Sequence, residues 1–249
     1  MAGMPASNVP RIGCAGWSIP SRYAGLFGPG ESMLARYATR FTAVEINSSF
    51  YRPHQRKTYE RWAASVPSEF RFSVKLPRTV SHDSGLVGVG GLLDRFLDEV
   101  NGLGNTLGSL LLQLPPSLAL DSRRAGGFFR ALQRRSPAAV VCEPRHASWF
   151  TAQADALLQR YGIARAAVDP ARFAAASQPG GTPTCQYWRW HGSPRMYYSD
   201  YTDAALAGLA DQVSARRIGG HAPWVIFDNT AHGFAVANAA RLQERMCDA

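Results

Sequence analysis

The sequence predicts a single-domain α/β protein with the (β/α)8 TIM-barrel fold, and three observations lead to this prediction. Eight short strand-like runs follow one another along 249 residues, and helix-like segments separate them. Several runs are almost entirely apolar, as at residues 138–142 and 225–227. Such strands are typical of a parallel sheet that is covered on both faces. Eight strand–helix units also fit a chain of this length.

The predicted strands and helices alternate along the whole chain. The strand-like runs cover residues 11–15, 42–46, 71–75, 109–113, 139–143, 164–169, 186–191 and 224–228. The helix-like segments cover residues 32–40, 57–65, 92–103, 122–134, 152–161, 203–217 and 234–245. Between the sixth and seventh strands, DPARFAAAS followed by QPGGTPT leaves room for a short helix at most. An open, doubly wound sheet is the competing architecture, but the number of units and the chain length favour the barrel.

The chain divides into a short N-terminal tail, residues 1–10, and one barrel domain, residues 11–245. No internal repeat, low-complexity tract or linker interrupts this domain. The first residues, MAGMPASNVPR, contain neither a basic start nor an apolar stretch, so a secretory signal is not expected. No apolar run approaches the ~20 residues that a membrane span needs. We therefore expect a cytoplasmic protein that does not bind a membrane.

Arginine supplies almost all of the positive charge. The formal net charge is +9, and Lys57 and Lys75 are the only lysines among 27 basic residues. This excess favours an anionic partner, either a small phosphorylated molecule or nucleic acid. The same composition is typical of a GC-rich genome. The basic residues are scattered, with short pairs at 134–135 and 216–217, whereas a dedicated nucleic-acid surface would cluster them more.

The cysteines do not form a recognisable site. They lie far apart in the sequence and include no CxxC pair, which argues against a structural zinc site and against a disulfide framework. Cys14 and Cys142 lie within apolar runs, where a small buried thiol is the expected interpretation.

Polar side chains follow almost every predicted strand. The stretch FTAVEINSSFYRP is the clearest case, because Glu45 and Asn47 end an apolar strand and Tyr51 and Arg52 come directly after it. Burying such groups without partners costs several kcal/mol each. In a barrel, the reactive groups gather at the carboxyl ends of the strands, here called the rim. Residues two apart on a strand share a face. The pairs with this spacing are Glu45–Asn47, Glu143–Arg145 and Arg189–His191.

Seven motifs in order resemble those of one family. They are GCAGWSIPSRYAGLF, FTAVEINSSFYR, FRFSVKLPRTVSH, LGSLLLQLPPSL, CEPRHASW, QYWRWHG followed by YYSDY, and FDNTAHGFAVANAARL. The set resembles the YecE-like family, domain of unknown function family 72, whose members are TIM-barrel proteins. The resemblance runs from about residue 11 to residue 242. It implies the TIM-barrel fold and a site at the rim, but it implies no particular reaction. The family usually reads FNNT where this chain has Asp228 in FDNT.

Six side chains near the strand ends are candidates for catalysis. They are Glu45, Lys75, His82, Glu143, Asp169 and His191. The carboxylates could act as general acids or bases, or bind a hard divalent metal. Alternatively, each pairs with an arginine of the same rim, which neutralises it. No HExxH or other tight ligand spacing occurs. We therefore predict no metal and no cofactor, with a divalent metal as the alternative.

Lys75 stands out because the chain otherwise uses arginine. A flexible point charge or a deprotonatable amine can do what a guanidinium cannot. Schiff-base chemistry is one interpretation, and an ion pair with Glu45 on the neighbouring strand is the other. His82, in the loop TVSHDS, is either a second acid–base group or a solvent-exposed loop histidine.

A further set of rim residues is predicted to bind the substrate. It consists of Trp17, Asn47, Tyr51, Arg52, Gln113, Arg145, Trp149, Arg189, Tyr201, Asn229 and Gly233. Asn229 and Gly233 precede the last helix, whose N-terminus suits a phosphate, although Asn229 could simply cap that helix. Trp149 and Tyr51 are expected to wall a pocket. Trp190 alternates with its neighbours and is expected to pack outward.

Three functional hypotheses follow from these patterns. The first is an enzyme acting on a small anionic substrate, phosphorylated or carboxylated and sugar-like, in which Glu45 and Glu143 transfer protons. Hydrolase, lyase and isomerase all remain open. The second is a nucleic-acid binding or processing protein, with steeply salt-dependent binding. The third is a non-catalytic ligand sensor. The fold alone does not choose among them.

Overall fold

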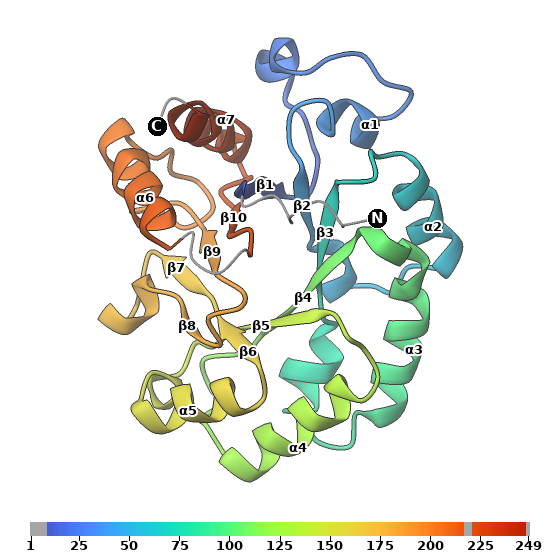
Figure 1. Cartoon of the computed structure of the whole chain (residues 1–249), viewed down its shortest axis with the longest axis vertical. Coiled ribbons are helices and arrows are strands. Elements are labelled where there is room, and N and C mark those ends of the chain that lie inside the picture. The colour runs from blue at the N-terminus through green and yellow to red at the C-terminus, as the bar shows by residue number, and fades with distance from the viewer. Residues whose placement is uncertain (1–8, 217–220, 248–249) are drawn as a thin grey trace, which may run out of the picture.

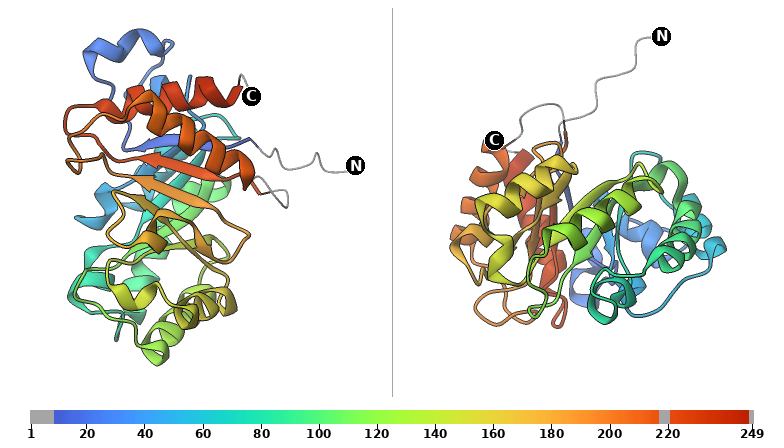
Figure 2. Two further views of the ribbon diagram at one scale, coloured as in Figure 1. Left: turned by 90° about the vertical axis from the view of Figure 1, so that its left-hand side faces the viewer. Right: turned by 90° about the horizontal axis from the view of Figure 1, so that it is seen from below.

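The computed structural model describes residues 9–216 and 221–247, and it shows a ring of strands surrounded by helices (Figure 1). The strands are β1 Arg11–Ala15, β2 Ala43–Ile46, β3 Arg71–Lys75, β4 Leu107–Gln113, β5 Ala139–Glu143, β6 Ile163–Arg165, β7 Ala167–Asp169, β8 Gly180–Gly181, β9 Tyr187–Trp190 and β10 Trp224–Phe227. The helices are α1 Met33–Tyr37, α2 Arg56–Ala64, α3 Gly90–Val100, α4 Ser122–Gln133, α5 Ala152–Arg160, α6 Asp203–Ala215 and α7 Phe234–Cys247. Figure 2 shows from two further sides that the helices lie outside the strands.

The ring closes through the sixth barrel strand. The strand order is β7-β9-β10-β1-β2-β3-β4-β5-β6-β8, and every pairing is parallel except that of β8 with β6. Ala166 alone separates β6 from β7. β6 pairs with β5, and β7 pairs with β9. The interrupted strand formed by residues 163–169 therefore closes the ring of parallel strands, and β8 pairs with β6 at its edge. The predicted barrel is therefore confirmed, and the open doubly wound sheet is excluded.

The connection between the sixth and seventh barrel strands contains no α-helix. It holds a single 3-10 turn, Ala174–Ser177, followed by β8, in agreement with the room that the sequence leaves there. The third helix also differs from its prediction. It ends at Val100 instead of residue 103, and Gly104 adopts a positive φ of 51°. This conformation favours glycine and breaks a helix. Arg217, the predicted end of the sixth helix, lies outside the described residues.

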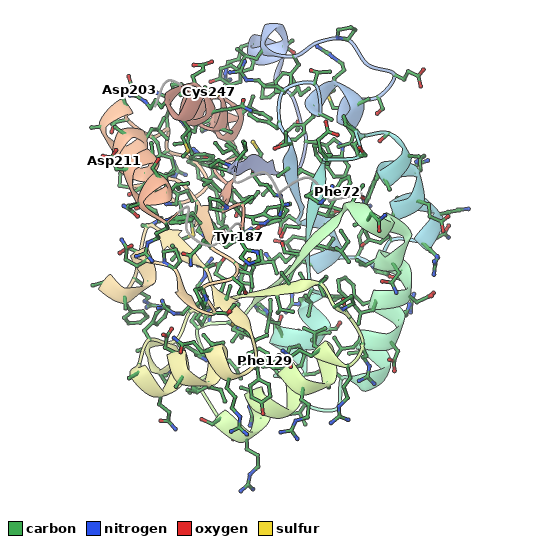
Figure 3. All side chains as sticks on the ribbon, in the orientation of Figure 1. Phe72, Phe129, Tyr187, Asp203, Asp211 and Cys247 are labelled. Atoms are coloured by element: carbon green, nitrogen blue, oxygen red, sulfur yellow. The ribbon has the colours of Figure 1, made fainter. Side chains whose placement is uncertain are left out.

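The interior of the barrel has an apolar lower layer and a charged upper layer. The lower layer is a cluster of buried side chains: Ala43, Leu111, Val141, Ala164, Ala166, Cys185, Tyr187, Trp224 and Ile226. Because side chains two apart share a face of a strand, Glu45, Glu143 and Arg189 come directly above Ala43, Val141 and Tyr187. In Figure 3, Tyr187 lies near the centre of the ring, whereas Phe129 lies out toward α4. A separate and larger core fills the space between strands and helices, and it includes Trp190, which packs outward as expected.

Within the described residues, no helix has the length and apolar character to cross a bilayer. The buried thiols expected at Cys14 and Cys142 are confirmed, since both side chains are buried and unpaired. Burial raises the pKa of the Cys14 thiol to about 12.

Gly13 allows a tight contact between β1, β2 and the first helix. The hydroxyl of Tyr37 accepts a hydrogen bond from the Cys14 N–H at 2.8 Å and donates one to the Ala43 carbonyl at 3.0 Å. A Cβ atom at Gly13 would lie 1.9 Å from that carbonyl oxygen. The chain therefore needs glycine at this position for the strands to approach.

We predict that Gly13→Ala lowers the free energy of unfolding by about 2 kcal/mol or more, because overpacking forces the backbone apart. Urea denaturation measures the change. Gly127→Ala is the matched control, since it lies inside α4 with nothing within 4 Å of an added Cβ. This control should leave stability unchanged or raise it by about 0.5–1 kcal/mol. Equal stability of the two variants would contradict the proposed tight contact.

Candidate functional site

A buried arginine lies at the centre of the charged layer. Arg189, in β9, is 1% exposed. Its Nε and Nη2 atoms donate to the two carboxylate oxygens of Glu45, each at 2.8 Å. Its Nη1 donates to Glu143 Oε2 at 3.2 Å, and its Nη2 lies 2.9 Å from Asp228 Oδ2. Burial would lower the pKa of Arg189, but the charges of Asp228, Glu45 and Glu143 outweigh it and hold this pKa well above its usual value.

Two further side chains extend this cluster toward the rim. Arg145 Nε donates to Glu143 Oε1 at 2.8 Å, and its Nη2 contacts the same oxygen. The His191 ring has Nδ1 3.0 Å from Asp228 Oδ2 and Nε2 3.3 Å from Arg145 Nη2. Nδ1 also lies 3.4 Å from Arg189 Nη1, and Nε2 lies 3.5 Å from Glu143 Oε1, so both ring nitrogens contact charged groups. We call the six side chains the Arg189 network: Arg189, Glu45, Glu143, Asp228, Arg145 and His191.

Glu143 and Asp228 of the network have lowered pKa values, which favour their ionised forms. Burial alone would raise the pKa of Glu143, but Arg145, Arg189 and His191 outweigh it and hold this pKa well below its usual range. Burial is likewise outweighed at Asp228, mainly by Arg189, so that its pKa is lowered. Below the network, the Tyr187 hydroxyl lies 3.2 Å from Glu45 Oε2 and 3.0 Å from Ser73 Oγ. The network is thus tied to the apolar lower layer.

Lys75 lies at the edge of the network and is far less constrained. It ends β3 and is 4% exposed. Its Nζ donates to Asn47 Oδ1 at 3.0 Å and lies 4.2 Å from the centre of the Phe50 ring. Among the described residues, this is its one hydrogen bond, although an ammonium carries three donors. Burial and the charge of Arg189 lower the pKa of Lys75 to about 8, against the opposing effect of Glu45, Glu143 and Asp228.

His82 borders the same place. Its ring lies 5.0 Å from the ring of Phe50, which also contacts Lys75, and its Nδ1 lies 2.8 Å from Ser81 Oγ. Partial burial lowers the pKa of His82, and the positive charges of Lys75 and Arg78 lower it further. His82 is therefore neither a free loop histidine nor a member of the Arg189 network.

Several predicted site residues are directed elsewhere. Trp149 is 1% exposed, packs 6.5 Å from the Phe129 ring and donates its indole N–H to the Leu118 carbonyl at 3.0 Å. The prediction that it walls a pocket is therefore wrong, because its short helical turn directs the ring into the core between strands and helices. Trp17 packs edge-on against Trp62 of α2 at 5.0 Å, outside the ring.

Asp169 and Tyr201 bind each other instead of the network. The Tyr201 hydroxyl donates to Asp169 Oδ1 at 2.8 Å and accepts the Gly192 N–H at 2.8 Å. Burial and the negative charge of Asp169 raise the pKa of Tyr201. No ion pair joins Asp169 to an arginine or lysine within residues 9–216 and 221–247, so it is the one predicted carboxylate that the structure leaves apart from the others.

The loop residues Tyr51 and Arg52 lie on the outer part of the rim. Tyr51 is 71% exposed, and both residues line a cavity of about 210 Å³ that reaches Leu92 and Phe96 of α3. Gln113 is half-buried and makes no hydrogen bond to another described side chain. Among the described residues, none of these three makes a side-chain hydrogen bond or ion pair with the Arg189 network, although Gln113 is the register partner of Glu143 between β4 and β5.

The region before α7 is only partly available to an anion. Asn229 Nδ2 donates to the Ser199 carbonyl at 2.8 Å and to Asn238 Oδ1 at 2.7 Å. Gly233 has a φ of 72°, and its N–H donates to the Thr230 carbonyl at 2.9 Å. A cleft of about 650 Å³ lies beside this turn. Phosphate binding at this turn stays a prediction.

The sequence interpretation missed Tyr187 and Tyr197. Two-residue spacing places Tyr187 on the same face as Arg189 and His191, so this signal was present. Tyr197 offered no periodic signal because it lies in a loop. It has a φ of 70°, is 40% exposed, and its ring lies 5.9 Å from that of His191. A non-glycine residue in this strained conformation is often found at a functional site.

Residues 9–216 and 221–247 bring together no group of metal ligands. Among the described residues, no three His, Cys, Asp or Glu side chains have the geometry to hold a metal ion. The physical reason is that the arginines of the network occupy the carboxylate oxygens that a metal would need.

We predict that Arg189→Met lowers the free energy of unfolding by about 3–5 kcal/mol, because it leaves the buried Glu45 without its counter-charge and removes one positive partner from Glu143 and from Asp228. Arg241→Met is the control, since Arg241 pairs with Asp200 and Asp203 at the surface and should cost about 1 kcal/mol or less. Denaturation in urea at neutral pH compares them. An equal loss for both variants would show that the network does not stabilise the barrel.

The difference in free energy of unfolding between wild type and Arg189→Met should depend on pH, with a sign that the pKa values of the carboxylates determine. Glu143 and Asp228 have lowered pKa values in the folded protein. The stabilisation that these two carboxylates give the folded protein is therefore fully present above their ordinary pKa values of 4.5 and 3.8. It is lost as the pH falls through their lower pKa values in the folded protein. The difference between wild type and Arg189→Met should shrink on acidification below about pH 4.

Comparisons with known proteins agree with the fold and with the resemblance in the sequence. The chain is 34% identical over 104 residues to the UPF0759 protein YecE of Escherichia coli K12, a match that covers 42% of this chain and 37% of YecE. It is 24% identical over 148 residues to the UPF0759 protein YunF of Bacillus subtilis 168, which covers 56% of this chain and 52% of YunF. The chain thus spans about a third to a half of the length of these curated relatives.

Solved structures resemble the whole chain. A DUF72 family protein of Enterococcus faecalis V583 superposes with a TM-score of 0.81 at 19% identity, over 96% of both chains. One of Thermotoga maritima MSB8 superposes with a TM-score of 0.78 at 23% identity, over 97% of this chain and all of that one. The family described as "protein of unknown function DUF72" matches residues 11–249. The chain belongs to the DUF72 family, to which the resemblance in its seven motifs pointed.

Proposed function

We propose that the protein is an enzyme that transfers protons on a small anionic substrate at the rim, with Lys75 as the base. The substrate is phosphorylated or carboxylated, and the reaction belongs to the isomerase or lyase class. The observation that carries this proposal is the state of Lys75, which has a pKa of about 8 and a single hydrogen bond next to a saturated ionic network. A base with a pKa near the working pH is the most effective in general catalysis.

The carboxylates are less suited to this role than the sequence suggests. Glu45 and Glu143 are fully buried, and each of their oxygens accepts at least one hydrogen bond from an arginine. Taking a proton would require breaking these contacts, and the pKa of Glu143 already lies well below its usual range. We infer that these two residues fix the arginines and set the electric field at Lys75.

Arg145 supports the binding of an anion at the same place. Its side chain is 21% exposed, the largest exposure of the paired groups in the network. Its Nε and Nη2 atoms are engaged with Glu143, while its Nη1 makes no hydrogen bond with the described residues. A guanidinium with free donors binds a carboxylate or a phosphate well.

The nucleic-acid alternative gains no support from the surface. Many surface arginines pair with acidic neighbours, as Arg56 does with Glu60 and Asp98, and Arg135 with Asp94. Such pairing reduces the positive field that a phosphate backbone needs. The non-catalytic sensor remains as a defined outcome of the experiment below.

Proton transfer can be detected without knowing the overall reaction. A panel of phosphorylated and carboxylated sugars and of keto acids is incubated with the protein in deuterium oxide, and NMR follows the loss of carbon-bound protons. We expect exchange in at least one compound, with a rate that rises with pH up to about 8 as Lys75 loses its proton. Lys75→Met should slow this exchange by about 100-fold or more.

Lys57→Met is the matched control, because Lys57 is the other lysine of the chain and lies exposed in α2. It should exchange at the wild-type rate. Exchange that survives in Lys75→Met would remove Lys75 from the mechanism. Saturable binding of a panel member with no exchange at any pH would instead support the sensor.

The lowered pKa of Lys75 also predicts a change in stability with pH. Its folded value of about 8 lies below the ordinary 10.5, so the unfolded chain binds more protons between these values and stability rises with pH across them. Below pH 8, Lys75→Met should therefore be more stable than wild type, by up to roughly 3 kcal/mol. Urea denaturation at pH 7 and pH 10 should show this advantage shrinking; a constant difference would contradict the pKa shift.

A further inference from the structure

A second pocket opens at the rim beside the Arg189 network. It has a volume of about 280 Å³ and lies between the loops that follow β4, β5, β7 and β9. We call it the Phe150 pocket. Its lining residues are Pro116, Pro144, Arg145, Phe150, Val168, Pro170, Ala171, Arg172, Phe173, Ala176 and Met196. Because all four loops leave the carboxyl ends of strands, the pocket is on the same side of the barrel as Lys75.

The walls of the pocket are apolar and aromatic. Nine of its eleven lining residues are apolar. The rings of Phe150 and Phe173 lie 5.4 Å apart with an interplanar angle of 40°. The guanidinium of Arg165 lies over the Phe150 ring, 5.1 Å from its centre. An apolar cavity of about 150 Å³ is enough to hold benzene. The Phe150 pocket therefore has room for one aromatic ring with a short acidic chain.

The charge of the pocket is of one sign. Among the described residues that line it, Arg145 and Arg172 are the charged ones, and none is a carboxylate. Arg172 is exposed and makes no ion pair with the described residues. Arg145 is anchored to Glu143 and contacts His191, and its Nη1 atom is not engaged by that anchoring. Two guanidinium groups at the edge of an apolar pocket suit a ligand that is apolar at one end and anionic at the other.

We propose that the Phe150 pocket binds the apolar, aromatic-sized part of an organic acid, whose negative charge pairs with Arg172 and Arg145. This proposal rests on the proposed function, because the pocket holds the non-reacting part of the same substrate. It narrows the substrate from any small anion to an acid with an apolar body. Arg145 links the two places, since it lines this pocket and is part of the network beside Lys75.

Direct binding measurements test the pocket without any turnover. Phenylacetate and 3-phenylpropionate serve as probes, with acetate as the anion that lacks a ring and phenylacetamide as the neutral compound of the same shape. Titration calorimetry and saturation-transfer NMR should show that the two aromatic acids bind saturably and at least about tenfold more tightly than acetate or phenylacetamide. Equal affinity for acetate or for phenylacetamide would overturn the proposal.

Variants locate the binding. Arg172→Gln should weaken phenylacetate binding by about tenfold, because it removes a charge-assisted contact. Ala171→Phe fills the pocket and should abolish the binding. Arg134→Gln is the charge-matched control: Arg134 is exposed beyond α4 and does not line the pocket. It should bind as wild type does. Wild-type affinity in both Arg172→Gln and Ala171→Phe would place the acids elsewhere and refute the pocket.

The outcomes separate this inference from the proposed function. If phenylacetate binds as described but no compound exchanges protons, the pocket stands and catalysis by Lys75 fails. If Lys75-dependent exchange occurs while none of the aromatic acids binds, the pocket is refuted and the proposed function stands.

Discussion

The buried charge of Arg189 is the constraint on which the upper half of the barrel depends. An arginine that is 1% exposed has lost its water and must receive that stabilisation from the protein. Three carboxylates provide this stabilisation: Glu45, Glu143 and Asp228, which come from strand ends spaced around the ring. The ends of β2, β5, β9 and β10 are therefore held at a fixed separation. Apolar residues of similar volume would often stabilise such an interior as well or better, so the energetic cost of this network is an argument for a chemical role.

The network also explains why Lys75 differs from an ordinary surface lysine. Its positive neighbour Arg189 and its burial both disfavour the ammonium form, and the three carboxylates compensate only in part because their charge is already shared with arginines. A carboxylate that was free to pair with Lys75 would raise its pKa instead. The saturation of Glu45 and Glu143 by arginine thus leaves the lysine able to change its protonation near neutral pH.

Much of this arrangement could be predicted from period-two spacing, and the failures lie where that spacing ends. The strand residues Glu45, Glu143 and Arg189 each follow an inward-facing position, and the structure brings them into contact. The sequence also indicated that the carboxylates could pair with arginines of the rim, as the alternative to acid–base or metal-binding roles. Trp149 and Tyr197 lie beyond their strands, where the backbone turns and no sequence period fixes the direction of a side chain. The closure of the ring through a divided sixth strand likewise needed the long-range pairings of β6 and β7.

Access distinguishes the two parts of the rim. Glu45, Glu143 and His191 are fully buried, so a substrate cannot reach them without disrupting the ionic contacts that hold the strands. Arg145 lies at the edge of this sealed layer, with its side chain 21% exposed, and also lines the Phe150 pocket. Lys75 is 4% exposed and makes a single hydrogen bond with the described residues. A ligand that enters there meets unsaturated donors first and the saturated network behind them. In the proposed function, the chemistry falls to the few groups that the network leaves incompletely bonded, and the network keeps them in that state.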